Sequence, residues 1–510
     1  MLKKILIKNF KPFSQTEAVR MAPITLIYGP NSAGKSSIIQ SLIMMTQTIN
    51  GQKSKVNSDL ITKGSLVDLG NYASIIHHHE IDKTLSFEYE FSQPDTARKR
   101  SEDFAEIVKV VMNFESGDNK GISFPSLSEY SFTARVMAGD IAIQVSRSIK
   151  GGSNQGNLDG EDEKEELAAA DLFEFGPQTD LKMVNDYANT RMNTRGVGSS
   201  KNLNNIFAST LKTMKFRKGT DSFYARMSST PPYLPTNLAI SRNDRENSMG
   251  ARDEKYHFQR GVEDLLQRCD FKLRRELSSI IYLAPLRSYP SRYYFMEGMP
   301  NDYVGSKGED VVPLLFQSKS SSGERFFLIK KLNQCCKDFG IPYTFEVSNK
   351  GDPITGDVIV LTLKDTRTGV KVGPSDVGFG IGQLLPILVQ GMILSENSKG
   401  PGSRIICVEQ PEIHLHPRLQ ASMADFFIST AAKNNNIQWI LETHSEALVT
   451  RLQRRIREKK ISSRDVSILY INPLGKKGST IQELRLDDDG EFIDLWPDGF
   501  FVETFNDMMN

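Results

Sequence analysis

Residues 29–36 read Gly-Pro-Asn-Ser-Ala-Gly-Lys-Ser and match the pattern G-x-x-x-x-G-K-[ST] at every fixed position. In such a loop, backbone N–H groups and the positive end of a helix dipole face an anion, so the loop can hold a triphosphate. Lys35 is expected to reach the β- and γ-phosphates, and the Ser36 hydroxyl is expected to bind Mg2+. The sequence therefore predicts a site for ATP and Mg2+, whose other nucleotide-binding residues are Asn31, Ser32, Ala33, Gly34 and Ser37.

Four further patterns follow in the second half of the chain. The first, residues 375–385, is a Gly-rich turn that opens a helix and contains Gly378 and Gly380. The second, residues 404–412, is an apolar strand that ends in acidic residues. The third is Ile-His-Leu-His-Pro at 413–417. The fourth, residues 439–445, is another buried strand, and it ends in a histidine.

The elements that must position the phosphate loop are present beside it. Residues 24–28 are apolar and β-branched and predict a buried strand, and residues 37–45 predict a helix. An earlier strand is expected over residues 2–10. Farther along, strands are expected over residues 64–72, 84–91, 280–287, 343–347 and 357–363, and an amphipathic helix over 326–339.

The middle of the chain gives weaker patterns. Apolar residues at helical spacing predict a helix over 101–114. Residues 151–166 are polar and Gly-rich, which predicts a mobile loop. Residues 151–180 are acidic and residues 181–280 are basic, so this region could contact the phosphate backbone of DNA, although a solvated basic face explains the charge equally well. Three consecutive histidines at 77–79 are expected in a loop or strand edge, because neighbours in a strand point to opposite faces.

Composition excludes several other classes of protein. The 510 residues exceed what one core usually covers, so two or three structural units are expected. Four cysteines and seven histidines show no zinc-binding spacing. No apolar run approaches the roughly 18 residues that span a bilayer, and the N-terminus lacks the apolar core of a signal peptide. We expect a cytoplasmic protein that does not contact the membrane.

The order of these patterns resembles a known family. The strand that ends at Asn9-Phe10, with a phosphate loop near residue 30, resembles the opening of ABC-type ATPase heads. The four later patterns resemble the signature loop, Walker B strand, D-loop and switch histidine of those heads. Three pieces resemble more closely the bacterial ATPases of the overcoming-lysogenization-defect (OLD) type: Glu-Gln-Pro-Glu-x-His-Leu-His-Pro, Tyr-Leu-x-Pro-Leu-Arg and the C-terminal Trp-Pro-Asp-Gly-Phe-Phe. OLD-type ATPases are a branch of the ABC fold shared with RecF and the SMC-like repair ATPases. The resemblance covers residues 1–90 and 280–510.

The resemblance implies roles for four residues. ABC heads end Walker B with Asp, which holds Mg2+, and Glu, which activates water; here these positions are Glu409 and Gln410. Gln can orient a water molecule but cannot take its proton. Either Glu412 serves as the base or hydrolysis is slow; alternatively, Glu412 only caps the following helix. His444 corresponds to the switch histidine that contacts the γ-phosphate.

The resemblance also implies a fold and an assembly. We expect an α/β protein: an ABC-type ATPase head (P-loop NTPase) built from both ends of the chain, with a helical and irregular insertion. The expected parts are an N-terminal ATPase part (1–92), an insertion (93–279), connecting strands and a helix (280–372), a C-terminal ATPase part (373–470) and a tail (471–510). A homodimer or higher homo-oligomer would complete each ATP site, because the Walker A loop of one subunit faces Gly378 and Gly380 of the other.

Such proteins occur in phage-defence operons, as in the Septu and PARIS systems, paired with a separate effector nuclease. The leading expectation is therefore an ATP-binding, slowly hydrolysing switch subunit of an antiphage complex. A DNA-repair or recombination ATPase of the RecF type is the alternative, and a transporter ATPase is disfavoured by the long insertion. The residues after His444 are too few for the Toprim nuclease of the OLD proteins proper, so nuclease activity is not expected in this chain.

Overall fold

The structure is a computed structural model in which the chain forms two compact units. The first comprises Met1–Lys3, Pro12–Ile43 and Ser279–Asn510, and the second comprises Lys4–Lys11 and Met44–Ser278. The residues described are 1–51, 59–91, 106–119, 122–136, 139–147, 172–175, 224–226, 237–239, 271–296, 303–320, 328–352, 354, 356–396, 404–433, 437–475 and 478–497.

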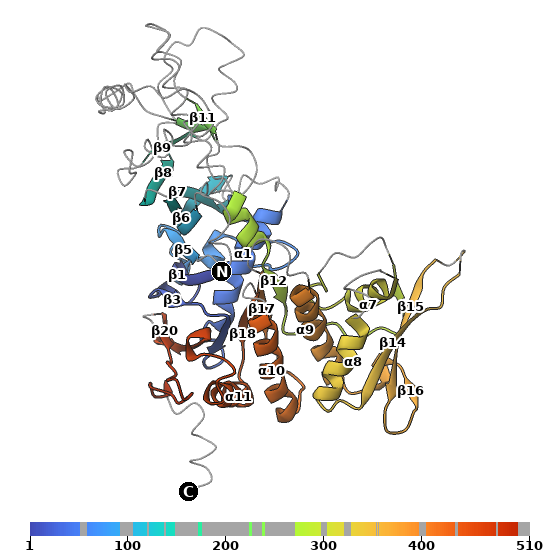
Figure 1. Ribbon diagram of the computed structural model, residues 1–510. Coiled ribbons are helices and arrows are strands. Elements are labelled where there is room, and N and C mark those ends of the chain that lie inside the picture. Colours follow the sequence, from blue (N-terminus) through green and yellow to red (C-terminus); the bar gives the residue numbers. More distant parts are fainter. Residues whose placement is uncertain are drawn as a thin grey trace, which may run out of the picture. The chain divides into compact units, whose positions relative to one another are not determined.

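A six-stranded sheet organises the first unit (Figure 1). Its order is β12 (Ile281–Leu283), β17 (Arg404–Glu409), β18 (Ile437–Glu442), β4 (Ile24–Tyr28), β19 (Val466–Pro473) and β20 (Ser479–Glu483). The first five strands are parallel and β20 is antiparallel. Because β4 lies between β18 and β19, the sheet is assembled from both ends of the chain, which confirms the predicted α/β head.

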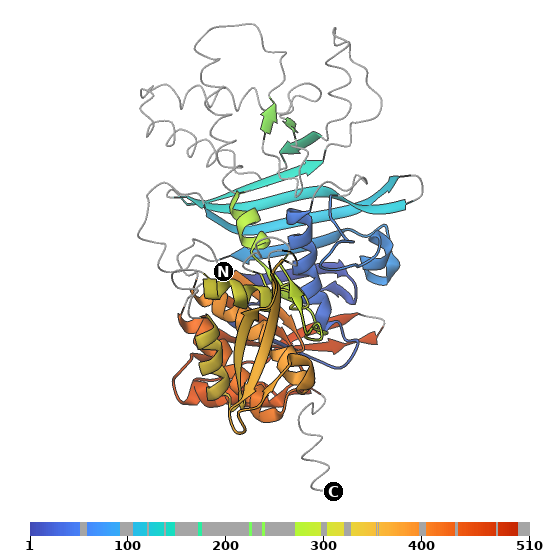
Figure 2. The same ribbon diagram turned by 90° about the vertical axis from the view of Figure 1, so that its right-hand side faces the viewer.

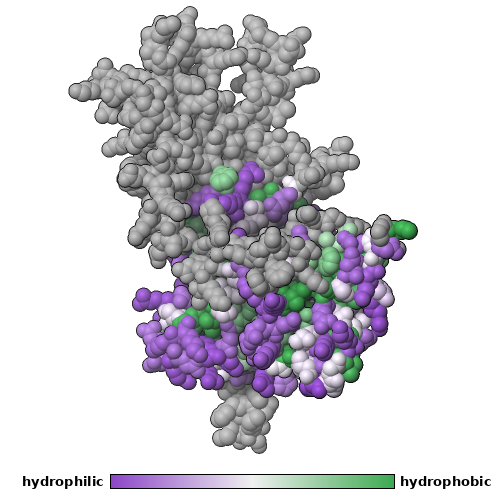
Figure 3. Space-filling view, turned by 45° about the vertical axis from the view of Figure 1, so that its right-hand side comes forward, coloured by the Kyte–Doolittle hydropathy of each residue, from purple (hydrophilic) through white to green (hydrophobic). Residues whose placement is uncertain are grey.

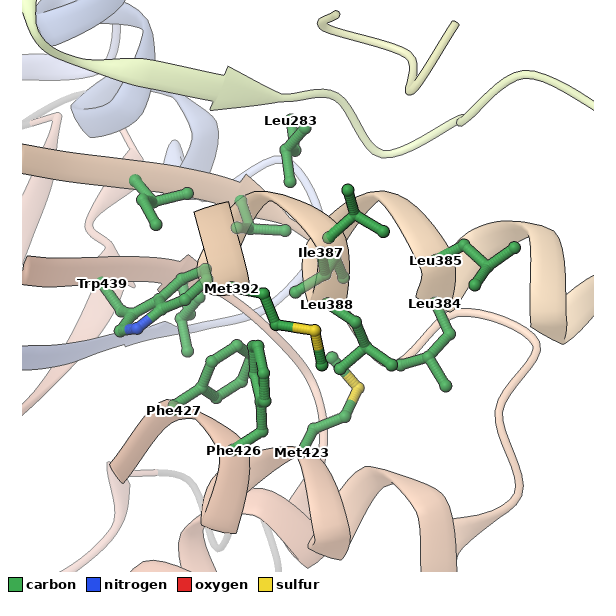
Figure 4. Packing of buried hydrophobic residues seen from close by; sticks show 14 of the residues in the cluster. Leu283, Leu384, Leu385, Ile387, Leu388, Met392, Met423, Phe426, Phe427 and Trp439 are labelled. Atoms are coloured by element: carbon green, nitrogen blue, oxygen red, sulfur yellow. The ribbon is translucent and has the colours of Figure 1, made fainter. Parts of the chain in front are cut away.

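Helices cover this sheet through an apolar core (Figure 4). The helices α9 (Phe379–Glu396), α10 (Pro417–Lys433) and α11 (Glu446–Arg457) follow or precede the buried strands, and α1 (Lys35–Asn50) follows β4. Leu384, Leu388 and Met392 of α9 belong to the same buried cluster as Phe427 of α10 and Trp439 of β18, and Met392 lies nearest of the three to the two rings. The indole of Trp439 lies 4.7 Å from the Phe427 ring, measured between ring centroids. These contacts hold α9 and α10 on the strands that end at the acidic residues.

A smaller antiparallel sheet belongs to the same unit. In it β15 (Val358–Asp365) pairs with β13 (Tyr294–Phe295), β14 (Tyr343–Asn349) and β16 (Lys371–Val372). The helices α7 (Val311–Ser320) and α8 (Leu328–Asp338) accompany it (Figure 1). The strands predicted over 343–347 and 357–363 are confirmed. The predicted helix over 326–339 is confirmed from residue 328 onward, and its first two residues lie outside the described part of the chain.

The second unit is built around antiparallel strands, which lie side by side in Figure 2. The long strands are β5 (Leu85–Phe91), β6 (Glu106–Asn119), β7 (Ile122–Val136) and β8 (Gly139–Arg147), and β1 (Leu2–Phe10) neighbours β5. The sheet continues through the short strands β9 (Leu172–Phe175), β10 (Tyr224–Arg226) and β11 (Asn237–Ala239). The two remaining short strands, β2 (Phe13–Gln15) and β3 (Val19–Arg20), lie in the first unit and lead to β4.

The helix predicted over 101–114 is wrong, because residues from 106 onward form β6. Val110, Met112 and Phe114 are buried, whereas their neighbours are only partly buried, so the true period is two. The β-branched residues Ile107, Val108, Val110 and Val111 favour a strand on local grounds as well. Most of the described part of the insertion is thus β-sheet, although residues 271–278 form a helix, and the loop predicted over 151–166 lies outside the described residues.

Two other local predictions need correction. The strand predicted over 64–72 is absent, and the segment makes only an isolated bridge between Lys63 and Asp68 before α2 (Tyr72–Ile75) begins. The three histidines form a 3-10 turn, η1 (His77–His79), with positive φ at His78 and His79. Within the described residues, no group of three or more His, Cys, Asp or Glu side chains could hold a metal ion by itself.

The surface of the described chain is mixed in character. On the face seen in Figure 3, hydrophilic side chains predominate and apolar side chains lie in small groups between them. Among the described helices, none is long and apolar enough to cross a membrane.

The packing of α9 on α10 and β18 gives a test of the core. A Cβ added at Gly391 would lie 2.7 Å from the Phe426 ring and 3.0 Å from the Trp439 ring. We expect Gly391→Ala to destabilise the protein by about 1 to 2 kcal/mol, because overpacking outweighs the helix-propensity gain of about 1 kcal/mol. Gly378→Ala, where a Cβ meets nothing within 4 Å, is the control for denaturant unfolding. Equal stability of the two variants would contradict the packing described.

Candidate nucleotide site

The phosphate-loop residues lie between β4 and α1, as predicted. Positive φ angles occur at Gly29 (145°), Ser32 (64°) and Gly34 (107°), so the chain turns tightly before α1 begins at Lys35. The Lys35 ammonium group is buried and donates to the carbonyl oxygens of Gly29 and Pro30 at 3.0 and 2.9 Å. The loop therefore wraps around the Lys35 ammonium group. The first N–H groups of α1 face the loop.

Neighbouring segments of the first unit fix the shape of this loop. A Cβ at Gly29 would lie 2.7 Å from the carbonyl oxygen of Ile471 in β19, and a Cβ at Gly34 would lie 2.3 Å from the Pro12 ring. The Ser479 hydroxyl donates to the carbonyl oxygen of Ala33 at 2.7 Å. Glycine is therefore required at both ends of the loop by packing as well as by backbone conformation.

Two carboxylates lie at the carboxyl ends of neighbouring parallel strands. Glu409 ends β17, Glu442 ends β18, and the two residues are register partners. Both side chains are buried and lie near the Ser36 hydroxyl at the start of α1, which has one proton and can donate to only one of them at a time. Glu409 also accepts a hydrogen bond from the Tyr282 hydroxyl at 2.8 Å. The strand register thus brings the predicted Ser36 and Glu409 together, and it adds Glu442.

Burial dominates the electrostatics of these groups. It raises the pKa of Glu409 to about 7, with a further upward contribution from the Glu442 charge. Burial also raises the pKa of Glu442 and lowers that of Lys35, although the nearby Glu442 and Glu412 carboxylates oppose the change at Lys35. These pKa shifts are the ones expected for charged groups in a poorly hydrated site, where electrostatic interactions are stronger than in water.

Arg287 braces the end of the Walker B strand. Its guanidinium group is buried and donates to the carbonyl oxygens of Glu409 at 2.7 Å and Gln410 at 3.3 Å. Burial lowers its pKa to about 10, against the opposing charges of Glu412 and Glu409. The side chain of Gln383 in α9 accepts from the Arg287 backbone N–H and donates to its carbonyl oxygen, both at 3.3 Å. The helix that follows the signature loop is therefore linked to the Walker B end.

The two residues proposed to act on water have different surroundings. Gln410 has a positive φ of 46°, and its backbone N–H donates to the carbonyl oxygen of Glu442 at 2.8 Å. The Glu412 carboxylate accepts from the His444 backbone N–H at 2.6 Å and from the Thr443 hydroxyl at 2.7 Å. Both Glu412 oxygens therefore hold the loop after β18. The alternative that its side chain caps the following helix, α10, is wrong.

His444 lies in that loop, half-buried, between β18 and α11. Burial lowers the pKa of His444, and the positive charge of Lys35 lowers it further. The neutral imidazole is therefore favoured. The next residue, Ser445, is the N-cap of α11, and its carbonyl oxygen accepts from the Tyr28 hydroxyl at 2.9 Å. Because Tyr28 ends β4, this bond ties the histidine loop to the strand that leads into the phosphate loop.

The signature-loop glycines lie at the start of α9 and differ from each other. A Cβ at Gly378 would meet nothing within 4 Å, whereas a Cβ at Gly380 would lie 2.7 Å from the carbonyl oxygen of His414 in the same chain. Gly380 is thus needed for packing within its own subunit. Within the described chain, no hydrogen bond joins this loop to residues 29–36. The structure brings Lys35, Ser36, Glu409, Gln410, Glu412 and His444 to one sheet edge and leaves Gly378 and Gly380 outside that cluster.

Four residues of the site were not predicted from the sequence: Tyr282, Arg287, Gln383 and Glu442. Glu442 ends an apolar strand just as Glu409 does, and that likeness is the signal that could have identified it. Tyr282 and Arg287 are part of the Tyr-Leu-x-Pro-Leu-Arg motif, but the motif alone does not show that they contact Walker B. Gln383 resembles any polar residue in a helix until its burial is known.

The residues present fit ATP and Mg2+. A serine hydroxyl and carboxylate oxygens are the hard ligands that Mg2+ prefers, usually one or two carboxylates with phosphate oxygens and water. The Glu442 Oε2 atom is buried and has no hydrogen-bond partner within the described chain, as expected for a group that awaits a ligand. When bound, Mg2+ would supply positive charge against the β- and γ-phosphates. Ser36 and Glu409 are the residues that would hold it.

The sequence belongs to a known family. Residues 1–449 match the model of the AAA ATPase domain family, so the chain belongs to this family of ATPases. Residues 461–510 match a second model, a protein family of unknown function designated DUF3696.

Comparison with individual proteins adds fold-level similarity only. None of the curated proteins matches the chain. Among solved structures, the Smc head domain of Pyrococcus furiosus bound to the C-terminal domain of ScpA is 10% identical, with 95% of this chain and 96% of that chain covered and a TM-score of 0.35. The SMC head domain of Thermotoga maritima is 8% identical, with 95% and 99% covered and a TM-score of 0.33.

The position of Lys35 predicts the effect of removing it. Lys35→Ala removes charge-assisted hydrogen bonds to phosphate worth roughly 1.5–3 kcal/mol each, so ATP affinity should fall at least about tenfold. Calorimetric titration with ATP measures the loss. Circular dichroism of the ligand-free variant checks that the loop change leaves the fold intact. Unchanged ATP affinity and activity in a folded variant would refute the assignment of the phosphate loop.

Proposed function

We propose that this AAA-family ATPase is an ATP-gated switch that hydrolyses ATP slowly and controls a separately encoded effector nuclease in bacterial antiphage defence. Bound ATP acts chiefly as a clamp between two subunits, and hydrolysis releases the clamp. The proposal depends on Gln410 and Glu412, the two residues beside the Walker B strand that could act on water. Gln410 has no basic group, and both oxygens of Glu412 are engaged in holding the loop of His444.

Slow hydrolysis follows from the missing base. A general base contributes about 10²–10⁴-fold to a rate, and its carboxylate must lie within hydrogen-bond reach of the water. The bonds from Thr443 and the His444 backbone hold the Glu412 carboxylate toward the loop after β18. Gln410 can orient a water molecule, since its backbone is held by Arg287 and Glu442. The site therefore favours long retention of ATP.

The signature loop supports a subunit interface. A Cβ added at Gly378 would meet nothing within 4 Å among the described residues, so the backbone there can approach a second molecule. The Ser375 hydroxyl in the preceding turn is buried and lacks a hydrogen-bond partner within the described residues. A phosphate oxygen from the partner's ATP would satisfy such donors. The proposed assembly is a head-to-tail homodimer, with Gly378 facing the partner's phosphate loop.

The defence role is the most specific part of the proposal. It is supported by the resemblance of Glu-Gln-Pro-Glu-x-His-Leu-His-Pro and Tyr-Leu-x-Pro-Leu-Arg to the OLD-type defence ATPases. In the Septu and PARIS systems the nuclease is a separate chain, unlike in the OLD proteins proper. A nuclease gene beside the gene for this protein would support the role.

The rate of hydrolysis tests the clamp. Gln410→Glu places a carboxylate where ABC heads have their base, and it should raise the steady-state rate of phosphate release by at least about tenfold, part of the 10²–10⁴-fold range. Glu412→Gln should change the rate less than about threefold, because an amide can still accept from His444 and bond Thr443. Fast turnover in the unmodified protein would refute the clamp.

The same assay tests two alternatives: that Glu412 is the general base, and that the protein is a DNA-repair ATPase. If Glu412→Gln lowers the rate by about 10²-fold or more, Glu412 is the base after all. Duplex DNA should leave the rate unchanged. Stimulation by DNA ends would favour a repair ATPase over the proposed switch.

The dimer is tested at Gly378. Gly378→Glu places a bulky anion where the partner's phosphates are expected, so ATP should no longer increase the sedimentation mass. Gly380 is unsuitable for this test because any side chain there strikes the His414 carbonyl. Gly369→Glu, at an open glycine in the loop between β15 and β16, is the matched control and should dimerise normally. An ATP-induced dimer that survives Gly378→Glu would exclude this loop from the interface.

A further inference from the structure

Glu442 is the most unusual acid of the site. It ends β18, between the phosphate-loop strand β4 and the Walker B strand β17, and it is the register partner of both Ile27 and Glu409. Its side chain is only 5% exposed, and it lies near the Ser36 hydroxyl. Glu409 lies near the same hydroxyl. Ser36 thus lies between two carboxylates from neighbouring strands.

The second oxygen of Glu442 has no partner. Oε2 is inaccessible to solvent and makes no hydrogen bond within the described chain. The other two acids differ, since Glu409 accepts from Tyr282 and Glu412 uses both oxygens. Leaving a buried charged oxygen unpaired is costly, and native sites of this kind usually await a ligand. The nearby Lys35 ammonium donates to the carbonyl oxygens of Gly29 and Pro30, and no hydrogen bond joins it to Glu442 Oε2 within the described chain.

We propose that Glu442 is a second carboxylate of the cation site, acting with Glu409 and Ser36 on the divalent ion that accompanies ATP. The proposal rests on the proposed ATPase function and names a further residue of the same site. Its position beside Glu409 at the strand ends, near Ser36, places the carboxylate within reach of an ion bound by that hydroxyl, directly or through a water molecule. Two carboxylates, one hydroxyl and phosphate oxygens form an oxygen ligand set suited to Mg2+.

The charge balance gives this proposal a distinctive consequence. Without a metal, Glu442 repels the phosphates held by the loop; with a metal, it attracts the ion that bridges them. Its removal should therefore weaken metal binding and strengthen metal-free nucleotide binding. A residue that only positioned Ser36 would not change these two affinities in opposite directions.

The test uses the full-length protein and Mn2+ as the probe. Electron paramagnetic resonance of free Mn2+ gives the metal affinity in the presence of ADP, and calorimetry in EDTA gives the metal-free ADP affinity. Glu442→Gln should weaken Mn2+ binding by about tenfold or more, within the range seen when residues near a metal are removed, and metal-free ADP should bind equally well or more tightly. Glu446→Gln makes the same charge change at an exposed position one turn away and should leave both affinities unaltered.

Thermal melting in EDTA shows whether Glu442→Gln folds, and Glu442→Asp provides a second variant that keeps the charge and should retain most of the Mn2+ affinity. Mn2+ affinity equal to that of the unmodified protein in a folded Glu442→Gln variant would overturn the proposal. Loss of both affinities together would also overturn it, because that result marks a structural role. Failure of the unmodified protein to bind ADP or ATP would instead refute the proposed function itself.

Discussion

The structure depends on burying charged groups together at one edge of a parallel sheet. Lys35, Arg287, Glu409, Glu412 and Glu442 all lie there with little exposure to water, and each is held by hydrogen bonds to backbone or to hydroxyl groups. Isolated charges could not be buried at acceptable cost. Their mutual placement requires β12, β17, β18 and β4 to be parallel neighbours, so that the strand ends meet. These charged groups can therefore meet only in the parallel sheet of the first unit.

The parts that could be predicted from the sequence are those encoded by local pattern. The phosphate loop, its strand and the Walker B strand are short apolar runs that end in distinctive polar residues, so residues 24–36 and 404–409 were found. Glu442 ends an apolar run as Glu409 does, but its place beside Glu409 and the phosphate-loop strand arises from the adjacency of β18 to β17 and β4, which the sequence does not record. β6 was mistaken for a helix because Ile107, Val111 and Phe114 fit a helical period by chance, while the alternation in burial shows only in the sheet.

The backbone around Walker B is held in an uncommon conformation. Gln410 and His414 both have positive φ, at 46° and 59°, which costs energy for residues with side chains. Arg287 and Glu442 hold Gln410 from two sides, and the Gly380 contact closes over the His414 carbonyl. The backbone conformation of Gln410 is therefore fixed by the protein before any ligand binds. Such preorganisation suits a residue that orients water without taking its proton.

The contact between Ser479 and Ala33 joins residues 446 positions apart in the chain. During synthesis, the phosphate loop emerges early but lacks this clamp and the β19 strand that packs on Gly29. At about 5–20 residues per second, the ribosome needs roughly 20 to 90 s more to supply them. The nascent chain therefore carries an unfinished nucleotide loop for most of translation. Competence to bind ATP therefore comes late, after the C-terminal strands have closed the loop.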